Sequence, residues 1–176
     1  MRRIATMMTA AAVVLFAAGM TAQGKPNFSG KWTMDPASAP QSGGGGGGGG
    51  RGMGGRGGGG WGQTFTLTQD ATTLKVERMQ GPATVTETFK LDGSDSKNTL
   101  PPMREGGAAT DVVSKAMWDG DKIVITSSRT VNMNGTDMKI DTKRVISMSG
   151  ADLQIDSTTT GMGDAPVTST VKYKKG

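Results

Sequence analysis

Hydrophobic and polar residues alternate along most of this chain, a pattern typical of β-strands with one buried face. Residues 121–131 and 136–148 show it best, and Asn134-Gly135 joins them. Asn-Gly between two alternating segments is a strong hairpin signal, because both residues of such a tight turn need a positive φ. A hairpin closed at this turn has one largely apolar face and these cross-strand pairs: Val131–Met138, Arg129–Ile140, Ser127–Thr142, Ile125–Arg144 and Ile123–Ile146.

Turn signals separate further alternating segments along the rest of the chain. We expect tight turns at Asp70-Ala71, Gly81-Pro82-Ala83, Asp119-Gly120 and Ser149-Gly150-Ala151, where glycine, proline and aspartate favour chain reversal. Folding at these turns predicts the following pairs: Leu67–Leu74, Phe65–Val76, Leu74–Phe89, Ala116–Ile123, Met148–Leu153 and Ile146–Ile155.

Ten segments are expected to be strands, and no segment has a convincing apolar repeat of helical period. Successive strands joined by tight turns form an antiparallel up-and-down meander. An open meander of this length would leave two exposed edges, and strand twist tends to curl it. The sequence therefore predicts an all-β fold, a meander closed into a barrel of about eight to ten strands. A sandwich of two sheets is the alternative.

The N-terminal residues 1–22 have the features of a secretory signal peptide. Met1-Arg2-Arg3 is basic, residues 7–18 are apolar, and small residues precede the expected cleavage after Ala22. The apolar stretch is too short to span a bilayer. We expect a periplasmic or secreted protein, and the absence of cysteine excludes a lipid anchor on that residue.

Residues 23–176 are expected to form a single β-barrel domain. A glycine-rich tract at residues 42–60 interrupts it after the first strand, and we expect a disordered loop there because glycine has no side chain to bury. Arg51 and Arg56 resemble the arginines of RNA-binding Arg-Gly-Gly segments. No aromatic residue lies between them, so we expect no nucleic-acid partner.

The composition excludes several kinds of chemistry. The chain contains no cysteine and no histidine, so it has no disulfide, no Ser-His-Asp or Cys-His catalytic arrangement, and no His- or Cys-held metal or haem. Its formal net charge of +5 is spread along the chain, unlike a nucleic-acid footprint. We expect a monomer without catalytic residues, metal or cofactor.

Several charged residues fall on the predicted inner face, where charge is costly unless it is paired or hydrated. They are Arg78, Glu87, Arg129 and Arg144. One interpretation is a wet cavity whose guanidinium groups hold a carboxylate or phosphate. The other places Arg129 at the barrel mouth, in contact with water, and makes Arg78–Glu87 a structural ion pair.

The segment Phe28-Ser29-Gly30-Lys31-Trp32 resembles the start of the first strand in the calycin superfamily, which contains lipocalins and intracellular lipid-binding proteins. The chain is also similar to exported lipocalin-like proteins of soil bacteria at 27–32, 42–60, 118–121 and 173–175. The resemblance implies a ligand-binding barrel in which Gly30 and Trp32 are structural. The lipid-binding proteins hold a carboxylate with an Arg-x-Tyr near the end; here Tyr173 matches the tyrosine and Val171 replaces the arginine.

Pattern and resemblance together predict an exported lipocalin-like binding protein without enzymatic activity. Its ligand would be a small amphipathic or anionic molecule inside the barrel, held by Arg78, Glu87, Arg129, Arg144 and Tyr173. The alternative is a surface or matrix interaction module with a closed core.

Overall fold

The computed structural model describes residues 24–39, 60–102, 107–133, 135–161 and 165–176. The predicted signal peptide and all but the last residue of the glycine-rich tract lie outside the described residues. The strands are β1 (Gly30–Met34), β2 (Thr64–Gln69), β3 (Thr73–Gln80), β4 (Ala83–Lys90), β5 (Asp92–Leu100), β6 (Thr110–Asp119), β7 (Lys122–Met133), β8 (Thr136–Ser149), β9 (Asp152–Thr160) and β10 (Val167–Lys175). One 3-10 turn, η1 (Pro36–Ser38), follows β1.

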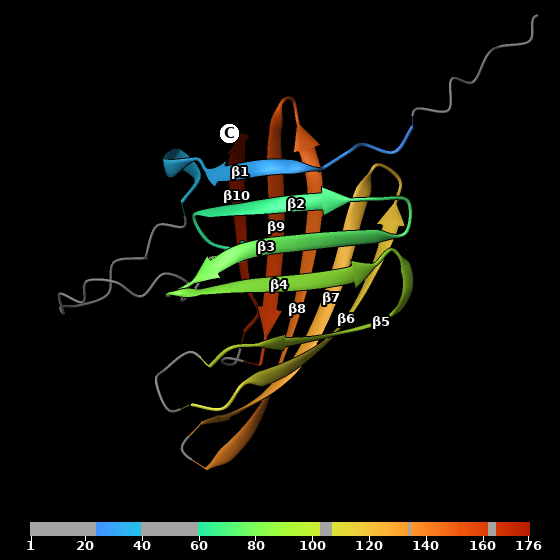
Figure 1. Ribbon diagram of the computed structural model, residues 1–176. Helices are drawn as coiled ribbons and strands as arrows, with labels where there is room; N and C mark the ends of the chain where they lie inside the picture. Colours follow the sequence, from blue (N-terminus) through green and yellow to red (C-terminus); the bar gives the residue numbers. More distant parts are fainter. Residues whose placement is uncertain (1–23, 40–59, 103–106, 134, 162–164) are drawn as a thin grey trace, which may run out of the picture.

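All ten strands belong to one antiparallel sheet with the order β4-β3-β2-β1-β10-β9-β8-β7-β6-β5. The first and last strands pair, so the meander curls round until its outer strands β4 and β5 approach each other. In Figure 1, β1–β4 run across the front and β7–β10 run steeply behind them. The predicted all-β barrel is confirmed. Within the described ranges, no helix has the length and apolarity that crossing a lipid bilayer would require.

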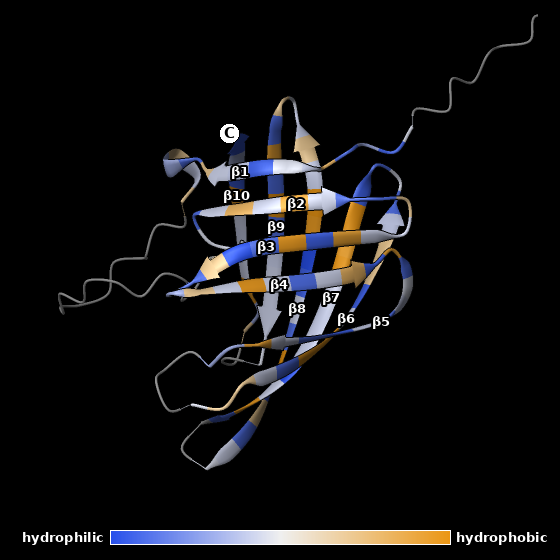
Figure 2. Ribbon diagram, viewed as in Figure 1, coloured by the Kyte–Doolittle hydropathy of each residue, from blue (hydrophilic) through white to orange (hydrophobic). Residues whose placement is uncertain are grey.

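The register of β7 against β8 is the predicted one. All five expected pairs are present, from Val131–Met138 near the turn to Ile123–Ile146 at the far end. The predicted pairs Met148–Leu153, Ile146–Ile155 and Leu74–Phe89 are present as well. Apolar and polar residues therefore alternate across the sheet as expected, which Figure 2 shows as alternating bands along the strands.

Two predicted registers were wrong by two residues. Phe65 stands opposite Arg78 and Leu67 opposite Val76, because the loop spans residues 70–72 and the pair nearest to it is Gln69–Leu74. The Asp70 carboxylate holds this wider loop by accepting hydrogen bonds from the backbone N–H of Thr72 (2.8 Å) and Thr73 (2.7 Å).

The second wrong register is that of β6 and β7, where Ala116 faces Ile125 because the turn residues are Gly120-Asp121. Gly120 has a φ of +62° there, a conformation that glycine adopts without strain. A two-residue shift leaves every side chain on its predicted face.

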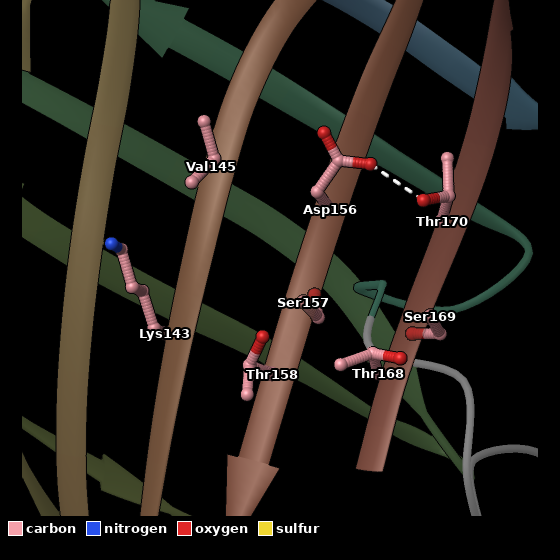
Figure 3. A pocket seen from close by; sticks show the side chains of 8 residues that line it. All are labelled: Lys143, Val145, Asp156, Ser157, Thr158, Thr168, Ser169 and Thr170. Carbon is pink, nitrogen blue, oxygen red and sulfur yellow. Dashed lines mark hydrogen bonds between the residues drawn. The ribbon is translucent and has the colours of Figure 1, made fainter. Parts of the chain in front are cut away.

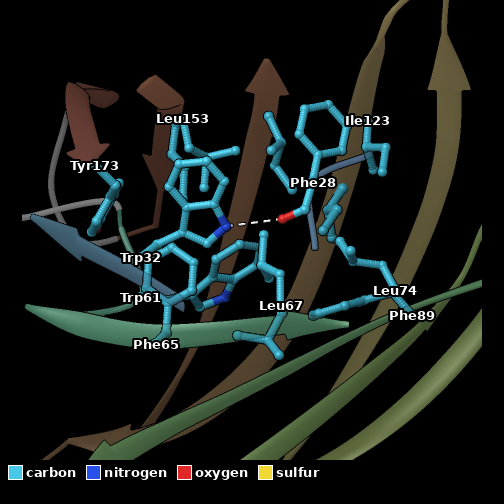
Figure 4. Close-up of a cluster of buried hydrophobic side chains, with 14 of the residues drawn as sticks. Phe28, Trp32, Trp61, Phe65, Leu67, Leu74, Phe89, Ile123, Leu153 and Tyr173 are labelled. Carbon is cyan, nitrogen blue, oxygen red and sulfur yellow. Dashed lines mark hydrogen bonds between the residues drawn. The ribbon is translucent and has the colours of Figure 1, made fainter. Parts of the chain in front are cut away.

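A large apolar cluster fills the barrel around Trp32, as Figure 4 shows. Trp32 is 1% exposed, and its indole N–H donates to the Phe28 carbonyl at 2.9 Å. Gly30 has a φ of +147°, and a Cβ there would lie 2.7 Å from Lys175 Cε. The other large side chains that are fully buried in the strands come from seven further strands and are Phe65, Leu67, Leu74, Phe89, Ile123, Ile125, Ile146, Leu153, Ile155 and Tyr173.

Side chains, instead of a backbone ladder, join β4 to β5 in the part of the chain that the structure describes. The Asn98 amide accepts from the Thr88 N–H (2.8 Å) and donates to the Thr88 carbonyl (3.1 Å). The Ser96 hydroxyl accepts from the Lys90 N–H at 2.9 Å. Asn98 thus provides the backbone N–H and carbonyl of Thr88 with the hydrogen bonds that a neighbouring strand would otherwise make.

Replacing Asn98 with alanine should lower the free energy of unfolding by about 1–2 kcal/mol, since two hydrogen bonds across this junction are lost. Denaturant unfolding measures the loss, and amide hydrogen exchange should become faster at Thr88. Lys97→Ala, at the exposed neighbouring position, is the control and should change neither quantity. Unchanged exchange at Thr88 in the Asn98 variant would show that these bonds do not hold the junction.

Candidate ligand-binding site in the barrel interior

The five predicted site residues lie on five different strands: β3, β4, β7, β8 and β10. The other four residues all act on the pKa of Arg144. Burial lowers the pKa of Arg144, Glu87 opposes that shift, and the guanidinium groups of Arg78 and Arg129 reinforce it. Tyr173 also acts on the same pKa. Positions that are far apart in the sequence therefore form one electrostatic cluster, in which three guanidinium groups accompany one carboxylate.

Arg78 and Glu87 form a nearly buried ion pair within this cluster. Arg78 Nε and Nη2 donate to the same Glu87 oxygen at 3.3 and 3.2 Å, and Arg78 Nη1 donates to Gln80 Oε1 at 3.1 Å. The exposed fractions of the two side chains are 15% and 7%. This geometry is that of the structural ion pair considered above.

Three aromatic side chains, Trp61, Phe65 and Tyr173, form an aromatic wall beside Arg144. Its guanidinium carbon is 5.8 Å from the centre of the Trp61 ring, within reach of a cation–π contact. Trp61 packs edge-on against Phe65 at 5.3 Å, and Phe65 packs edge-on against Tyr173 at 4.7 Å. Trp61 comes just after the glycine-rich tract, so the tract ends at this wall.

Two polar groups of the wall, the Trp61 indole N–H and the Tyr173 O–H, are buried and have no acceptor for their protons within the described residues, although the Trp61 backbone N–H lies close enough to the tyrosine oxygen to act on its pKa. Trp61 is 3% exposed and Tyr173 is fully buried. An unsatisfied buried donor costs about 1–3 kcal/mol, so native proteins give such groups a water or a ligand. Next to a guanidinium group, two such donors suit an oxyanion.

Gly60 packs directly against Tyr173. A Cβ at position 60 would overlap the tyrosine hydroxyl. Sequence reasoning could not single out this glycine, because it is one of many in the tract.

Hydroxyl side chains form a row next to the charged cluster. Five consecutive strands place them directly opposite one another in the order Ser96, Ser114, Ser127, Thr142 and Thr159. A second row contains Arg144, Ser157 and Ser169.

These hydroxyls are well removed from the outside of the barrel. Ser114 and Ser127 share a hydrogen bond of 2.8 Å, and Ser96, Ser114 and Ser157 are at most 5% exposed. Sequence reasoning noted single members but missed the rows, because serine and threonine are also frequent on the outer face. The signal that could have found them is their common position in the register.

The inner face differs in solvent access from one end to the other. Phe28, Ile123 and Ile146, at the apolar end, are fully buried. At the polar end the inward-facing residues are only partly buried. They are Arg129, Arg144, Ser127, Thr142, Thr159 and Ser169. The polar part of the inner face is thus less completely buried than the apolar part.

Two hollows are lined mainly by residues of the outer face, with Ser157 and Ser169 also lining the larger one and Ser127 and Thr142 the second. The larger, about 500 Å³, extends over β8, β9 and β10, where Asp156 accepts a hydrogen bond from Thr170 at 2.6 Å (Figure 3). The second, about 430 Å³, lies over β5–β9 and includes Lys115 and Asp141. None of the five predicted site residues lines either hollow.

Burial raises the pKa of Tyr173 to about 12 from its ordinary 10.0, although the Trp61 backbone N–H and the Arg144 charge oppose the rise. Tyr173 is the chain's single tyrosine, so near-ultraviolet tyrosinate absorbance reports it alone. We expect a midpoint near 12 in the folded protein and near 10 after unfolding in urea.

The same pKa shift predicts how stability depends on pH. The folded protein holds the tyrosine proton more tightly than the unfolded chain, so this contribution is present below pH 10 and is lost as pH rises towards 12. Tyr173→Phe should remove that part of the alkaline decline. Equal midpoints in folded and unfolded protein would contradict the buried position of the hydroxyl.

Fold and interior together define an antiparallel ten-stranded barrel with a charged, hydroxyl-lined interior. A scan against protein-family models and a search of curated proteins found no match to the chain. Membership of the calycin superfamily stays a prediction from the first-strand motif.

Proposed function

We propose that this chain is an exported, calycin-type binding protein that holds a small amphipathic or anionic molecule inside its barrel. The observation that carries the proposal is the position of Arg144 beside the buried Trp61 and Tyr173, whose donors Trp61 Nε1 and the tyrosine O–H have no acceptor within the described residues. The charge of Arg129 also acts on the pKa of Arg144. Arginine suits this role because its planar group matches the geometry of carboxylate and phosphate. The first-strand motif around Gly30 and Trp32 supports the calycin assignment.

Each residue has a distinct part in the proposed site. Arg144 provides positive charge beside the aromatic wall, and Arg129, which is also partly buried, adds a second positive charge that acts on it. Glu87 holds Arg78 in place through their ion pair. Trp61 Nε1 and the Tyr173 hydroxyl donate hydrogen bonds to the ligand. With a pKa of about 12, the phenol keeps its proton near neutral pH, which suits reversible binding better than acid–base catalysis.

Binding of the fluorescent anion anilinonaphthalene sulfonate tests the proposal. Arg144→Met and Arg129→Met should each weaken binding by about tenfold or more, because a hydrogen bond to a charged group is lost. Lys143→Met is the matched control, since it removes an exposed charge on the outer face of the same strand. Equal affinity of the two arginine variants and the control would reject the proposal. Near-ultraviolet circular dichroism checks that each variant is folded.

The interaction module is a second candidate, favoured by the hollow of about 500 Å³ on the outer face. Its lining is rich in hydroxyl side chains and includes the charged Lys143 and Asp156. Under this alternative the interior would only be a core, and binding of an extended polar partner would depend on Asp156 and not on Arg144.

A further inference from the structure

The hydroxyl row indicates what kind of molecule the interior accepts. Its members come from neighbouring strands and stand directly opposite one another, so their hydroxyl groups form a continuous polar band across the inner wall. The flanking inward positions are Ile125 and Arg129 on β7, Ile140 and Arg144 on β8, and Ser157 on β9. The band is therefore bordered by both apolar and charged side chains.

Packing alone does not favour such a band. A buried hydroxyl loses its hydration, and valine would fill the position of a threonine without that cost. Ser96 has a structural use, since it accepts from the Lys90 N–H across the β4–β5 junction. Ser114 and Ser127 bond to each other, but a hydroxyl can donate one hydrogen bond and accept two, so this pair retains capacity for a further partner.

The band lies next to the charged cluster. Arg144 stands opposite Ser157 in the sheet, and Thr142 is the next inward residue along β8. The Arg144 guanidinium reaches the Trp61 ring on the other side. A molecule whose oxyanion lies between Arg144, Trp61 and Tyr173 would thus extend its remaining atoms along the hydroxyl groups.

We infer that the ligand is a polyhydroxylated oxyanion of the sugar-acid class, with its carboxylate or phosphate at Arg144 and its hydroxyl groups against the band. This inference rests on the proposed function and narrows it. A long-chain fatty acid fits less well, because its methylene groups would cover hydroxyls and leave them without partners. A sugar hydroxyl both donates and accepts, as the serine and threonine side chains do.

Isothermal titration calorimetry with four probes tests the inference: glucuronate, glucose phosphate, glucose and dodecanoate. Glucuronate or glucose phosphate should bind at least about tenfold more tightly than neutral glucose and than dodecanoate, since only these two combine charge with hydroxyl groups. The stronger of the two identifies the oxyanion as carboxylate or phosphate.

Two variants in the band provide the second measurement. Thr142→Val and Ser127→Ala remove a hydroxyl with little change of shape, and each should weaken the sugar-acid probe by about fivefold to tenfold. Thr126→Val is the matched control on the outer face of β7 and should leave affinity unchanged. Binding of anilinonaphthalene sulfonate, which has no hydroxyl groups, should not weaken in Thr142→Val or Ser127→Ala relative to Thr126→Val.

The outcomes separate this inference from the proposed function. If dodecanoate binds more tightly than both sugar acids, or if Thr142→Val and Ser127→Ala bind them as Thr126→Val does, the sugar-acid assignment is wrong. Anion binding that still depends on Arg144 would then leave the proposed function in place. If none of the four probes binds, and Arg144→Met and Arg129→Met bind anilinonaphthalene sulfonate as tightly as the Lys143→Met control, the sugar-acid inference and the proposed function are both wrong.

Discussion

Replacing Glu87 with methionine should destabilise the protein by about 3–5 kcal/mol, the usual cost of removing one partner of a buried ion pair. Glu87 is 5% exposed, and its carboxylate accepts two hydrogen bonds from Arg78. Without Glu87, its negative charge would no longer offset the positive charges of Arg78, Arg129 and Arg144. Denaturant unfolding of the purified variant measures the loss.

Glu77→Met is the control for this experiment, because Glu77 lies on the same hairpin and forms an exposed ion pair with Lys75 at 3.1 Å. It should change stability by less than about 1 kcal/mol. The double variant Arg78→Met/Glu87→Met should recover much of the loss, since it removes both charges. Equal unfolding curves for Glu87→Met and Glu77→Met would show that the pair is not buried in solution.

Trp32→Ala should lower the free energy of unfolding by about 3–5 kcal/mol, as expected when a large aromatic side chain leaves a cavity in a packed core. Trp32 is 1% exposed and stands opposite Phe65 in the sheet. Its ring lies 5.6 Å from Lys175 Nζ, and its N–H donates to the Phe28 carbonyl. One side chain thus connects the first strand to both of its neighbours and to the segment before it.

Trp32→Phe separates the two contributions of this residue, since it keeps most of the packing and removes the indole donor. We expect about half of the alanine effect. Trp118→Ala is the comparison, because Trp118 is only partly buried, stacked on Phe28 at 6.0 Å. A larger loss from Trp118 than from Trp32 would contradict the placement of Trp32 at the centre of the core.

The barrel and the inward direction of its residues could be predicted because strand alternation has a period of two and a tight turn keeps it in phase. The hairpin at Asn134-Gly135 shows this best, with every predicted pair in place. The same alternation assigned Arg78, Glu87, Arg129 and Arg144 to one face. Their meeting then follows from closure of the sheet, which brings strands from both halves of the chain around one interior.

Loop length and edge geometry could not be predicted in the same way. The Asp70 loop is widened by hydrogen bonds from Thr72 and Thr73, which residue type alone does not specify. The β4–β5 junction depends on where Asn98 meets Thr88, a contact between strands that share no backbone ladder. The hydroxyl band was missed for a related reason, because it becomes visible only after five strands are aligned.

Native mass spectrometry of the protein purified gently from its own host tests the central claim most directly. If the barrel holds a small anionic molecule, the folded protein should carry extra mass that is released on denaturation, and Arg144→Met protein prepared in parallel should carry less of it. A clean mass of the bare polypeptide for the wild-type protein, in every gentle preparation, would contradict the account.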